Sequence, residues 1–562
     1  MSTFPWLTVA GAVPLVGAIA IALTPGRSAA GSPADRRARD LLVKRLALVF
    51  SLITLALTIV IAVKFRPGGP RFQFQQVYQW IPQFGVHYAV GVDGIALVLI
   101  LMSTVLMPVV VLASWNDVEE VAASTASAAP GRRARRGRSA KSYFAMMLVL
   151  ETMMIGVFAA TDVFLFYVFF EAMLVPMYFM IGSYGVGQRQ YAAVKFLLYS
   201  LLGGLLMLVA VIALYVYSTH GGHQGTFLFT RLSHLALSPT TQKWLFLGFF
   251  IAFAIKAPLW PFHTWLPDAA TSAQPGAAVL LVGVLDKVGT FGMIRYCLDL
   301  FPSAAHFFTP LVIVLSVVGV LYGAVVAIGQ ADIKRLIAYT SVSHMGLITL
   351  GIFAMTSQGQ AGATLYMVNH GFATGALFIL AGFMVSRRKS HLIADYGGVQ
   401  KVAPVLAGLF LIAGLAGLAL PGLSTFVSEF LVLVGTFTRY EAAAVLATVG
   451  IILAAIYILW MYQRTMTGPV RAEVANMPDL KARELWAVAP LIALIVVLGV
   501  YPKPALDIIN PAVHSTLVGV HSRDPVPPHP ASAPARQAST TSLVQHGRGQ
   551  RGQTLRKQGS SA

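Results

Sequence analysis

The sequence has 562 residues, of which 57% are hydrophobic and only 11% are charged. A soluble domain carries about 25% charged residues, so this composition and a mean hydropathy of +0.74 exclude a soluble protein and predict many segments that lie in lipid. The single cysteine, Cys297, excludes a disulfide framework within the chain and any Cys-ligated zinc site or iron–sulfur cluster. No Gly-rich phosphate loop follows a strand, so we expect neither a cofactor nor a metal on this chain.

The apolar segments predict about fourteen transmembrane helices, because about 20 apolar residues cross a bilayer. The first is interpreted as a retained span, since it has neither a basic start nor a small-residue cleavage site. The fold class is therefore an all-α polytopic membrane protein. The predicted spans are 4–23, 45–63, 91–114, 143–160, 162–182, 191–217, 243–258, 275–297, 309–329, 335–355, 362–385, 403–437, 442–464 and 485–502.

Two of these spans are interrupted by proline. The seventh meets Pro258, Pro261 and Pro267, and the twelfth contains Pro421-Gly422 in its middle. Proline removes a hydrogen-bond donor and clashes with the preceding turn, and a membrane tolerates such a break only where protein or a watery cavity satisfies the freed groups. Broken helices at corresponding positions of two halves indicate a transport site.

The net charge of +19 reports topology and does not indicate a nucleic-acid partner, because the basic residues lie in loops between apolar segments. The loops that follow odd-numbered spans carry 23 Lys and Arg, and those that follow even-numbered spans carry seven. The positive-inside rule therefore places the odd loops in the cytoplasm of a bacterial cell and both termini outside the plasma membrane.

The order of spans and breaks also indicates a weak internal duplication with the pattern of two inverted five-helix repeats, broken at helices 7 and 12. The predicted organisation is N-terminal transmembrane helices over 1–114, a basic cytoplasmic loop over 115–142, a first repeat over 143–297, a second repeat over 309–464, a last helix over 485–502, an amphipathic surface helix over 504–520 and a disordered basic tail over 521–562.

Several ionisable residues lie deep in the predicted spans, where each costs at least about 2.5–3.5 kcal/mol. At about 1.5 Å per residue, most of them fall near the middle of a hydrocarbon layer about 30 Å thick. Charges at one depth form a lateral row, which can relay protons along the membrane plane. The candidates are Glu151, Glu171, Lys256, Asp286, Lys287, His344, His370 and Glu429, with Lys195 near the start of the sixth span.

We expect Glu171 and Lys256 to pair, because pairing relieves both desolvation costs. Asp286 and Lys287 are neighbours in sequence, but adjacent helical residues point about 100° apart, so we do not expect direct pairing. A histidine can exchange a proton near neutral pH, and His344 therefore suits a link from Lys287 to Glu429.

Each of these residues also has a structural interpretation. A single Glu–Lys pair can simply hold helices together, Glu151 and Asp286 can be structural, and a lone membrane histidine is commonly a hydrogen-bonded core residue. The basic loop Gly131–Arg138 is interpreted as a solvated loop that fixes orientation. Several charges at one depth, two of them beside helix breaks, favour the proton-relay hypothesis.

Five segments of the chain resemble the antiporter-like membrane subunits of bacterial NADH:quinone oxidoreductase, or respiratory complex I. The resemblance covers roughly residues 80–502. The segments are Phe166–Tyr178 (FYVFFEAMLVPMY), Ala254–Asp268 (AIKAPLWPFHTWLPD), Gly283–Gly289 (GVLDKVG), Asp332–Gly346 (DIKRLIAYTSVSHMG) and Leu420–Phe430 (LPGLSTFVSEF).

The resemblance implies fourteen helices and a subunit that translocates protons without a redox site of its own. It implies Glu171, Lys256, Lys287 and Glu429 as the proton path, with His344 and His370 as intermediates. A glutamate at position 429 is typical of the M-type subunits, whereas the L and N types usually have lysine there. NADH, FMN, iron–sulfur clusters and quinone are then expected on partner subunits, and L-type and N-type subunits are expected as neighbours in the bilayer.

The chain departs from the family pattern in three places. Asp286 stands where an apolar residue is expected before the lysine, residues 269–277 are looser than the usual loop, and the Arg-rich loop and long tail are additions. Two other functions share many of these features: an Mrp-type cation/proton antiporter or membrane-bound hydrogenase subunit, and a membrane scaffold that pumps nothing.

Overall fold

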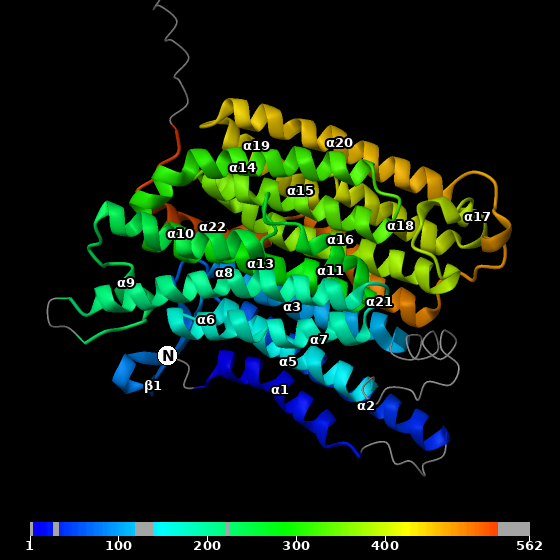
Figure 1. Cartoon of the computed structure of the whole chain (residues 1–562), viewed down its shortest axis with the longest axis horizontal. Coiled ribbons are helices and arrows are strands. Elements are labelled where there is room, and N and C mark those ends of the chain that lie inside the picture. The colour runs from blue at the N-terminus through cyan, green and yellow to red at the C-terminus, as the bar shows by residue number, and fades with distance from the viewer. Residues whose placement is uncertain (1–3, 26–32, 118–138, 221–223, 526–562) are drawn as a thin grey trace, which may run out of the picture. The chain divides into compact units, whose positions relative to one another are not determined.

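The computed structural model describes residues 4–25, 33–117, 139–220 and 224–525 (Figure 1). The Arg-rich run Arg132–Arg138 and most of the predicted tail lie outside these residues. Among the described residues, 12 helices are long and apolar enough to cross a membrane. The two further predicted spans, 243–258 and 403–437, are the interrupted ones, so the total of fourteen stays a prediction while the polytopic helical class is confirmed.

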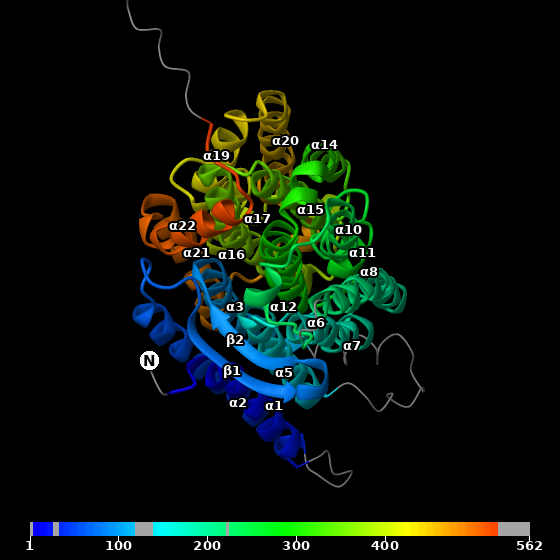
Figure 2. The same ribbon diagram turned by 90° about the vertical axis from the view of Figure 1, so that its left-hand side faces the viewer.

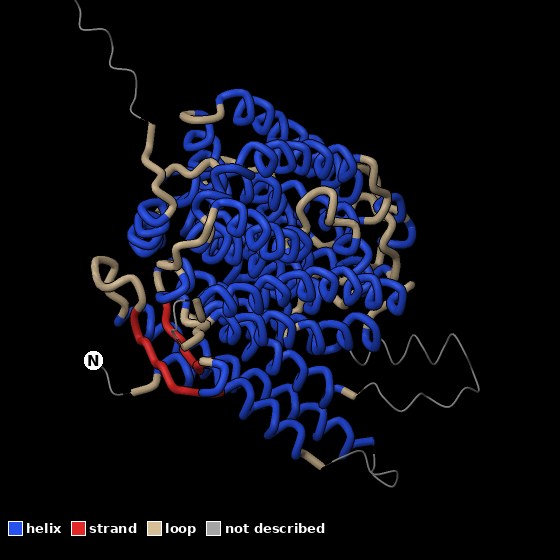
Figure 3. The backbone as a smooth tube through the Cα atoms, turned by 60° about the vertical axis from the view of Figure 1, so that its left-hand side comes forward, coloured by secondary structure: helices blue, strands red, loops and turns tan. Residues whose placement is uncertain are grey.

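The N-terminal part contains three of the long helices and a β-hairpin that the sequence analysis did not predict. The hairpin strands pair antiparallel, with Tyr78 opposite Tyr88, and run along one end of the helices (Figures 2 and 3). The segment is polar and contains glycine and proline, so its sequence pattern did not predict strands. The elements are α1 (Trp6–Leu23), α2 (Pro33–Lys64), β1 (Gln73–Ile81), β2 (Val86–Val92) and α3 (Gly94–Ala113).

The first predicted repeat contains more breaks than expected. The predicted fifth span divides into two helices at Met173, and the eighth contains two π-helical turns, Leu281–Leu285 and Met293–Leu298. The helices are α5 (Ala140–Ala159), α6 (Val163–Ala172), α7 (Leu174–Tyr184), α8 (Arg189–Ser218), α9 (Phe229–Leu232), α10 (Pro239–Lys256), α11 (Trp265–Ser272), α12 (Pro275–Leu280) and α13 (Asp286–Gly292).

The remaining helices follow the predicted order, and α20 lies at the edge opposite α1 and α2 (Figures 1 and 2). α22 packs against α3 and α16. The inverted relation of the two repeats stays a prediction. The helices are α14 (Pro302–Ile328), α15 (Ile333–Phe353), α16 (Ser357–Arg388), α17 (Val399–Val402), α18 (Pro404–Gly417), α19 (Ser424–Phe437), α20 (Glu441–Met466), α21 (Ala482–Val500) and α22 (Lys503–Gly519).

The two proline breaks lie where they are predicted, and protein groups satisfy their backbone. α10 ends at Lys256, and the indole of Trp265 donates a hydrogen bond of 2.9 Å to the carbonyl of Ile255. In the second break, the hydroxyl of Thr425 donates to the carbonyl of Ala416. These contacts replace the helical bonds that the breaks remove.

The most enclosed helices form the centre of the bundle. Over its most apolar 18 residues, the span Pro275–Leu298, which contains α12 and α13, consists entirely of buried residues, and in the corresponding stretches of α15 and α16 94% of the residues are buried. In the corresponding stretches of α8 and α20, only 39% and 33% of the residues are buried. Protein therefore surrounds the residues on the central helices, where charged groups can be compensated away from lipid.

A buried ion pair fixes one end of the central span to α3. Arg295 lies 2.8 Å from Asp93, and both side chains are almost fully buried. Asp93 also accepts a hydrogen bond from the backbone of Ala96 and so caps the first turn of α3.

We predict that Arg295→Met destabilises this subunit by about 3–5 kcal/mol, because it leaves the Asp93 carboxylate buried without its ion partner. Thermal unfolding of the purified protein measures the effect as a lower midpoint temperature. Arg231→Gln, at an exposed arginine of α9, is the control and should leave the midpoint unchanged. Equal midpoints for both variants would contradict the prediction.

Candidate functional site

Lys287 on α13 occupies the centre of the site and makes three polar contacts. Its Nζ lies 2.9 Å from Oδ1 of Asp286, 2.6 Å from Nδ1 of His370 on α16 and 2.5 Å from the carbonyl oxygen of Val282. The side chains of Asp286, Lys287 and His370 are completely buried. The contacts with His370 and with the Val282 carbonyl are hydrogen bonds, and the contact with Asp286 is an ion pair.

The expectation that Asp286 and Lys287 do not pair is wrong. The turn before them, Leu281–Leu285, is π-helical. The angle of about 100° between successive residues holds for a regular α-helix, so it does not give the directions of the backbone carbonyls in this turn. The lysine side chain is long and flexible enough to turn back and contact both the Val282 carbonyl, five residues earlier, and its neighbour Asp286. π-Helical turns inside α-helices occur frequently at functional sites.

From His370 the polar contacts continue towards Glu429. The rings of His370 and His344 lie 5.2 Å apart between centroids. His344 Nε2 lies 3.4 Å from the hydroxyl of Tyr457 on α20, and its ring lies 5.7 Å from that of Tyr366. The Tyr366 hydroxyl donates a hydrogen bond to Oε1 of Glu429 on α19.

These side chains form one buried set, which we call the relay cluster. It connects α13, α16, α15, α20 and α19. Five of its residues belong to the predicted row, and two tyrosines are added to them. The relay cluster consists of Asp286, Lys287, His370, His344, Tyr457, Tyr366 and Glu429.

The sequence analysis missed the two tyrosines of the relay cluster. Tyr366 lies four residues before His370, so the two share one face of α16, and this spacing could have identified it. The position of Tyr457 depends on how α20 packs, which no local pattern gives. Asn369 was also missed; its amide donates to the carbonyl of Ser424, at 2.6 Å, and holds α16 against the start of α19.

Glu171 and Lys256 lie near each other on α6 and α10 but do not form the expected ion pair. Lys256 Nζ lies 4.7 Å from the ring centroid of Phe170, a cation–π contact, and has no hydrogen-bond partner among the described residues. The Glu171 carboxylate lies against Gly204 of α8. Lys256 is buried and Glu171 is half-buried, so the two charges are in the protein interior without direct contact.

Two other candidate residues, Lys195 and Glu151, lie apart from the relay cluster. Lys195 pairs at 2.7 Å with Asp268 on α11, which also pairs with Arg335 at 2.9 Å. Lys195 is therefore already compensated by a carboxylate. Glu151 on α5 is completely buried, and neither of its oxygens has a hydrogen-bond partner among the described residues.

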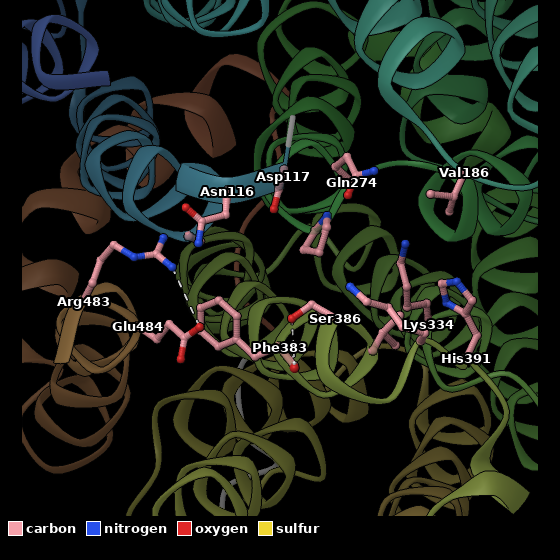
Figure 4. A pocket seen from close by; sticks show the side chains of 15 residues that line it. Asn116, Asp117, Val186, Gln274, Lys334, Phe383, Ser386, His391, Arg483 and Glu484 are labelled. Atoms are coloured by element: carbon pink, nitrogen blue, oxygen red, sulfur yellow. Dashed lines mark hydrogen bonds and ion pairs between the residues drawn. The ribbon is translucent and has the colours of Figure 1, made fainter. Parts of the chain in front are cut away.

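A cavity of about 260 Å³ lies at the ends of α3, α12 and α16 (Figure 4). Lys334 and His391 line one side of it, and Arg483 and Glu484 line another. Lys334 Nζ donates to the carbonyls of Thr271 and Ala273, at 2.7 and 2.6 Å.

The charge of Lys334 also affects the pKa of a histidine in the neighbouring loop. Burial, reinforced by the Lys334 ammonium, lowers the pKa of His391, which lies between α16 and α17. The cavity begins at Pro275, twelve residues before Lys287, so it lies about 18 Å along the helix from the relay cluster. Within the ranges that the structure describes, no group of three or more His, Cys, Asp or Glu side chains could hold a metal ion.

Known proteins are similar to this chain both in sequence and in fold. A sequence profile described as NADH:quinone oxidoreductase/Mrp antiporter, TM, matches residues 160–456. A Mycobacterium tuberculosis protein named NADH-quinone oxidoreductase subunit M is 52% identical, over 97% of this chain and 100% of that protein. The solved structure of respiratory complex I from Thermus thermophilus with bound NADH contains a chain that matches with a TM-score of 0.78 and 31% identity, over 92% of this chain and 99% of that chain.

A chain of the Mrp complex from Dietzia sp. DQ12-45-1b matches with a TM-score of 0.73 at 20% identity, over 90% of this chain and 52% of that chain. That likeness shows a shared fold alone.

The chain belongs to the subunit M family of NADH-quinone oxidoreductase, since the identity of 52% extends over nearly its whole length. The resemblance indicated by the sequence motifs is confirmed, and its function as a membrane-arm subunit of a proton-translocating complex follows from the family.

We predict that Gly204→Ala slows proton translocation, because a Cβ at Gly204 would lie 1.6 Å from Oε1 of Glu171 and must displace that carboxylate. The obstacle is the end of a flexible side chain, so folding should be preserved. Gly408→Ala is the matched control, because nothing lies within 4 Å of its Cβ position. Initial rates of NADH-driven proton uptake in vesicles measure the effect, and equal rates in the two variants would show that the position of Glu171 is unimportant.

We predict that Tyr366→Phe lowers proton translocation by about tenfold or more, because it removes the hydroxyl that binds Glu429. The ring is retained, so the packing of α16 against α19 should change little. The same vesicle assay measures this effect, with subunit content determined by immunoblot. A Tyr366→Phe complex that pumps at the wild-type rate would exclude this hydroxyl from the path.

Proposed function

We propose that this chain translocates protons laterally through the membrane interior, from Glu171 and Lys256 to Lys287 and then along the relay cluster to Glu429. The observation that carries the proposal is the contact of 2.6 Å between Lys287 Nζ and Nδ1 of His370, in which two titratable groups on different helices meet without exposure to lipid. A buried ionisable residue in a membrane protein is a functional candidate by default.

Transfer along the relay cluster begins at this contact. A proton leaves Nζ of Lys287 and binds Nδ1 of His370, so one N–H bond breaks and another forms, and the positive charge moves to the imidazole. His370 then releases the proton on Nε2, which has no hydrogen-bond partner among the described residues, towards His344 after a change in ring orientation. A histidine transfers a proton by accepting at one nitrogen and releasing at the other.

The last transfers lead from His344 to Glu429. The hydroxyl of Tyr457 contacts the imidazole of His344, and the hydroxyl of Tyr366 binds the carboxylate of Glu429. Each hydroxyl can donate one proton while it accepts another. Glu429 then holds the proton. It lies in the second turn of α19, just after the break that separates α18 from α19. Its release ends the path on this chain.

The start of the path is the separated pair Glu171 and Lys256. Because Lys256 lies over Phe170 and not on a carboxylate, a small movement of α6 relative to α10 changes how strongly the two charges interact. A charge interaction in a medium of low dielectric constant depends steeply on such a movement. The redox reaction is thereby coupled to the proton path through electrostatics and conformation.

The complex I relatives supply the setting for this proposal. Oxidation of NADH and reduction of quinone take place on partner subunits, which hold NADH, FMN, iron–sulfur clusters and quinone. The expected neighbours are the L-type and N-type subunits in a bacterial plasma membrane. The excess of basic residues in the odd loops supports a cytoplasmic position for those loops, with both termini outside.

We predict that Glu171→Gln, Lys256→Met and Lys287→Met each lower the number of protons moved per NADH oxidised, since each removes a titratable group from the path. Rates should fall by about tenfold or more, the effect of losing a proton-transfer group. Proton uptake and NADH oxidation are measured together in vesicles that contain the assembled complex. Lys401→Met, at an exposed lysine of α17, is the control.

The alternative function of this chain is a scaffold that joins its neighbours and pumps nothing. It predicts a different result: loss of assembly, with a normal proton yield in the complexes that remain. A wild-type proton yield for assembled Lys287→Met would establish the scaffold function and contradict the proton path.

A further inference from the structure

Asp286 is the one member of the relay cluster whose polar contacts end at Lys287. Its Oδ1 lies 2.9 Å from Lys287 Nζ, and neither oxygen has a hydrogen-bond partner among the described residues. The side chain is completely buried. A buried carboxylate without hydrogen bonds depends for its stability on the one charge beside it.

The three contacts of Lys287 therefore have different consequences for its proton. The carbonyl of Val282 accepts a hydrogen bond but cannot accept the proton. Asp286 can accept it, but from there the proton can only return. His370 can accept it and release another towards His344, so it is the only one of the three that leads onward.

We propose that Asp286 is a positioning residue that sets how strongly Lys287 holds its proton before His370 receives it. This inference rests on the proposed proton path and adds a residue that acts through Lys287. The negative charge of the carboxylate, 2.9 Å from Nζ, stabilises the ammonium form of Lys287. In the transfer, the Nζ–H bond breaks and the Nδ1–H bond of His370 forms, while Asp286 remains an anion.

Asp286 does not share this task with another carboxylate. α13 packs against α5, α10 and α15 and meets His370 of α16. None of the titratable groups on the first three helices makes an ion pair or hydrogen bond with Asp286 or Lys287 in the part of the chain that the structure describes. These groups are Lys141, Tyr143 and Glu151 on α5, Lys243 and Lys256 on α10, and Lys334, Arg335, Tyr339 and His344 on α15.

The inference is tested in the assembled complex by the pH profile of proton translocation. Asp286→Asn keeps the size of the side chain and removes its charge, so Lys287 holds its proton less strongly. We expect the alkaline limb of the profile to move to lower pH by about one unit or more, the scale on which a charge at this distance acts. Asp286→Glu restores the charge and should move the limb back towards the wild-type position.

Thr290→Val is the matched control. Thr290 is a buried polar residue of the same helix, and its hydroxyl donates to the backbone carbonyl of Lys287. Its loss should leave the pH profile unchanged. An Asp286→Asn profile that superimposes on those of wild type and Thr290→Val would overturn the inference.

Two further outcomes separate this inference from the proposed function. If Asp286→Asn has the wild-type profile while Lys287→Met abolishes pumping, the proton path stands and Asp286 has no part in it. If Asp286→Asn does not assemble, Asp286→Ala takes its place, because it also removes the charge beside Lys287. An alkaline limb at the wild-type pH in Asp286→Ala then overturns the inference, and a limb at lower pH supports it.

Discussion

A charge that lies inside a membrane must find its compensation within the protein, because no water is available to solvate it. In this chain that constraint is met at Lys287, whose ammonium contacts a carboxylate, an imidazole and a backbone carbonyl at 2.5–2.9 Å. These acceptors come from the π-helical segment, from α13 itself and from α16, so compensation of one charge brings two helices and three titratable groups together. The site for proton transfer is thus a consequence of solvating the lysine with protein groups.

The same constraint explains where the irregular backbone lies. The break after Lys256, the π-helical turn before Asp286 and the break before Glu429 each lie beside a charged residue of the proposed path. Broken backbone exposes polar groups, which are tolerable only within protein or water. The most enclosed helices are those that carry Lys287, His344 and His370. Burial of these helices by their neighbours therefore allows both the breaks and the charges.

Much of this arrangement could be predicted from the sequence, since hydropathy gives the spans and proline gives the two main breaks. Lys287 and Glu429 could be identified as candidate site residues, because an ionisable residue is easily recognised within an apolar segment. The Asp286–Lys287 contact could not be predicted, because the 100° rule assumes a regular helix and π-helical turns leave no clear pattern in sequence. Tyr457 could not be predicted either, since a tyrosine in an apolar helix has many possible partners and only the packing of α20 selects His344.

The central claim is that protons pass from Lys287 through His370. The most direct measurement is the number of protons moved per NADH oxidised by vesicles that contain an assembled His370→Gln complex. Glutamine can accept the hydrogen bond from Lys287 but cannot carry a proton from one nitrogen to the other, so the account predicts a lower ratio with Lys287 still bound in place. An unchanged ratio, in a complex with normal subunit content, would contradict it.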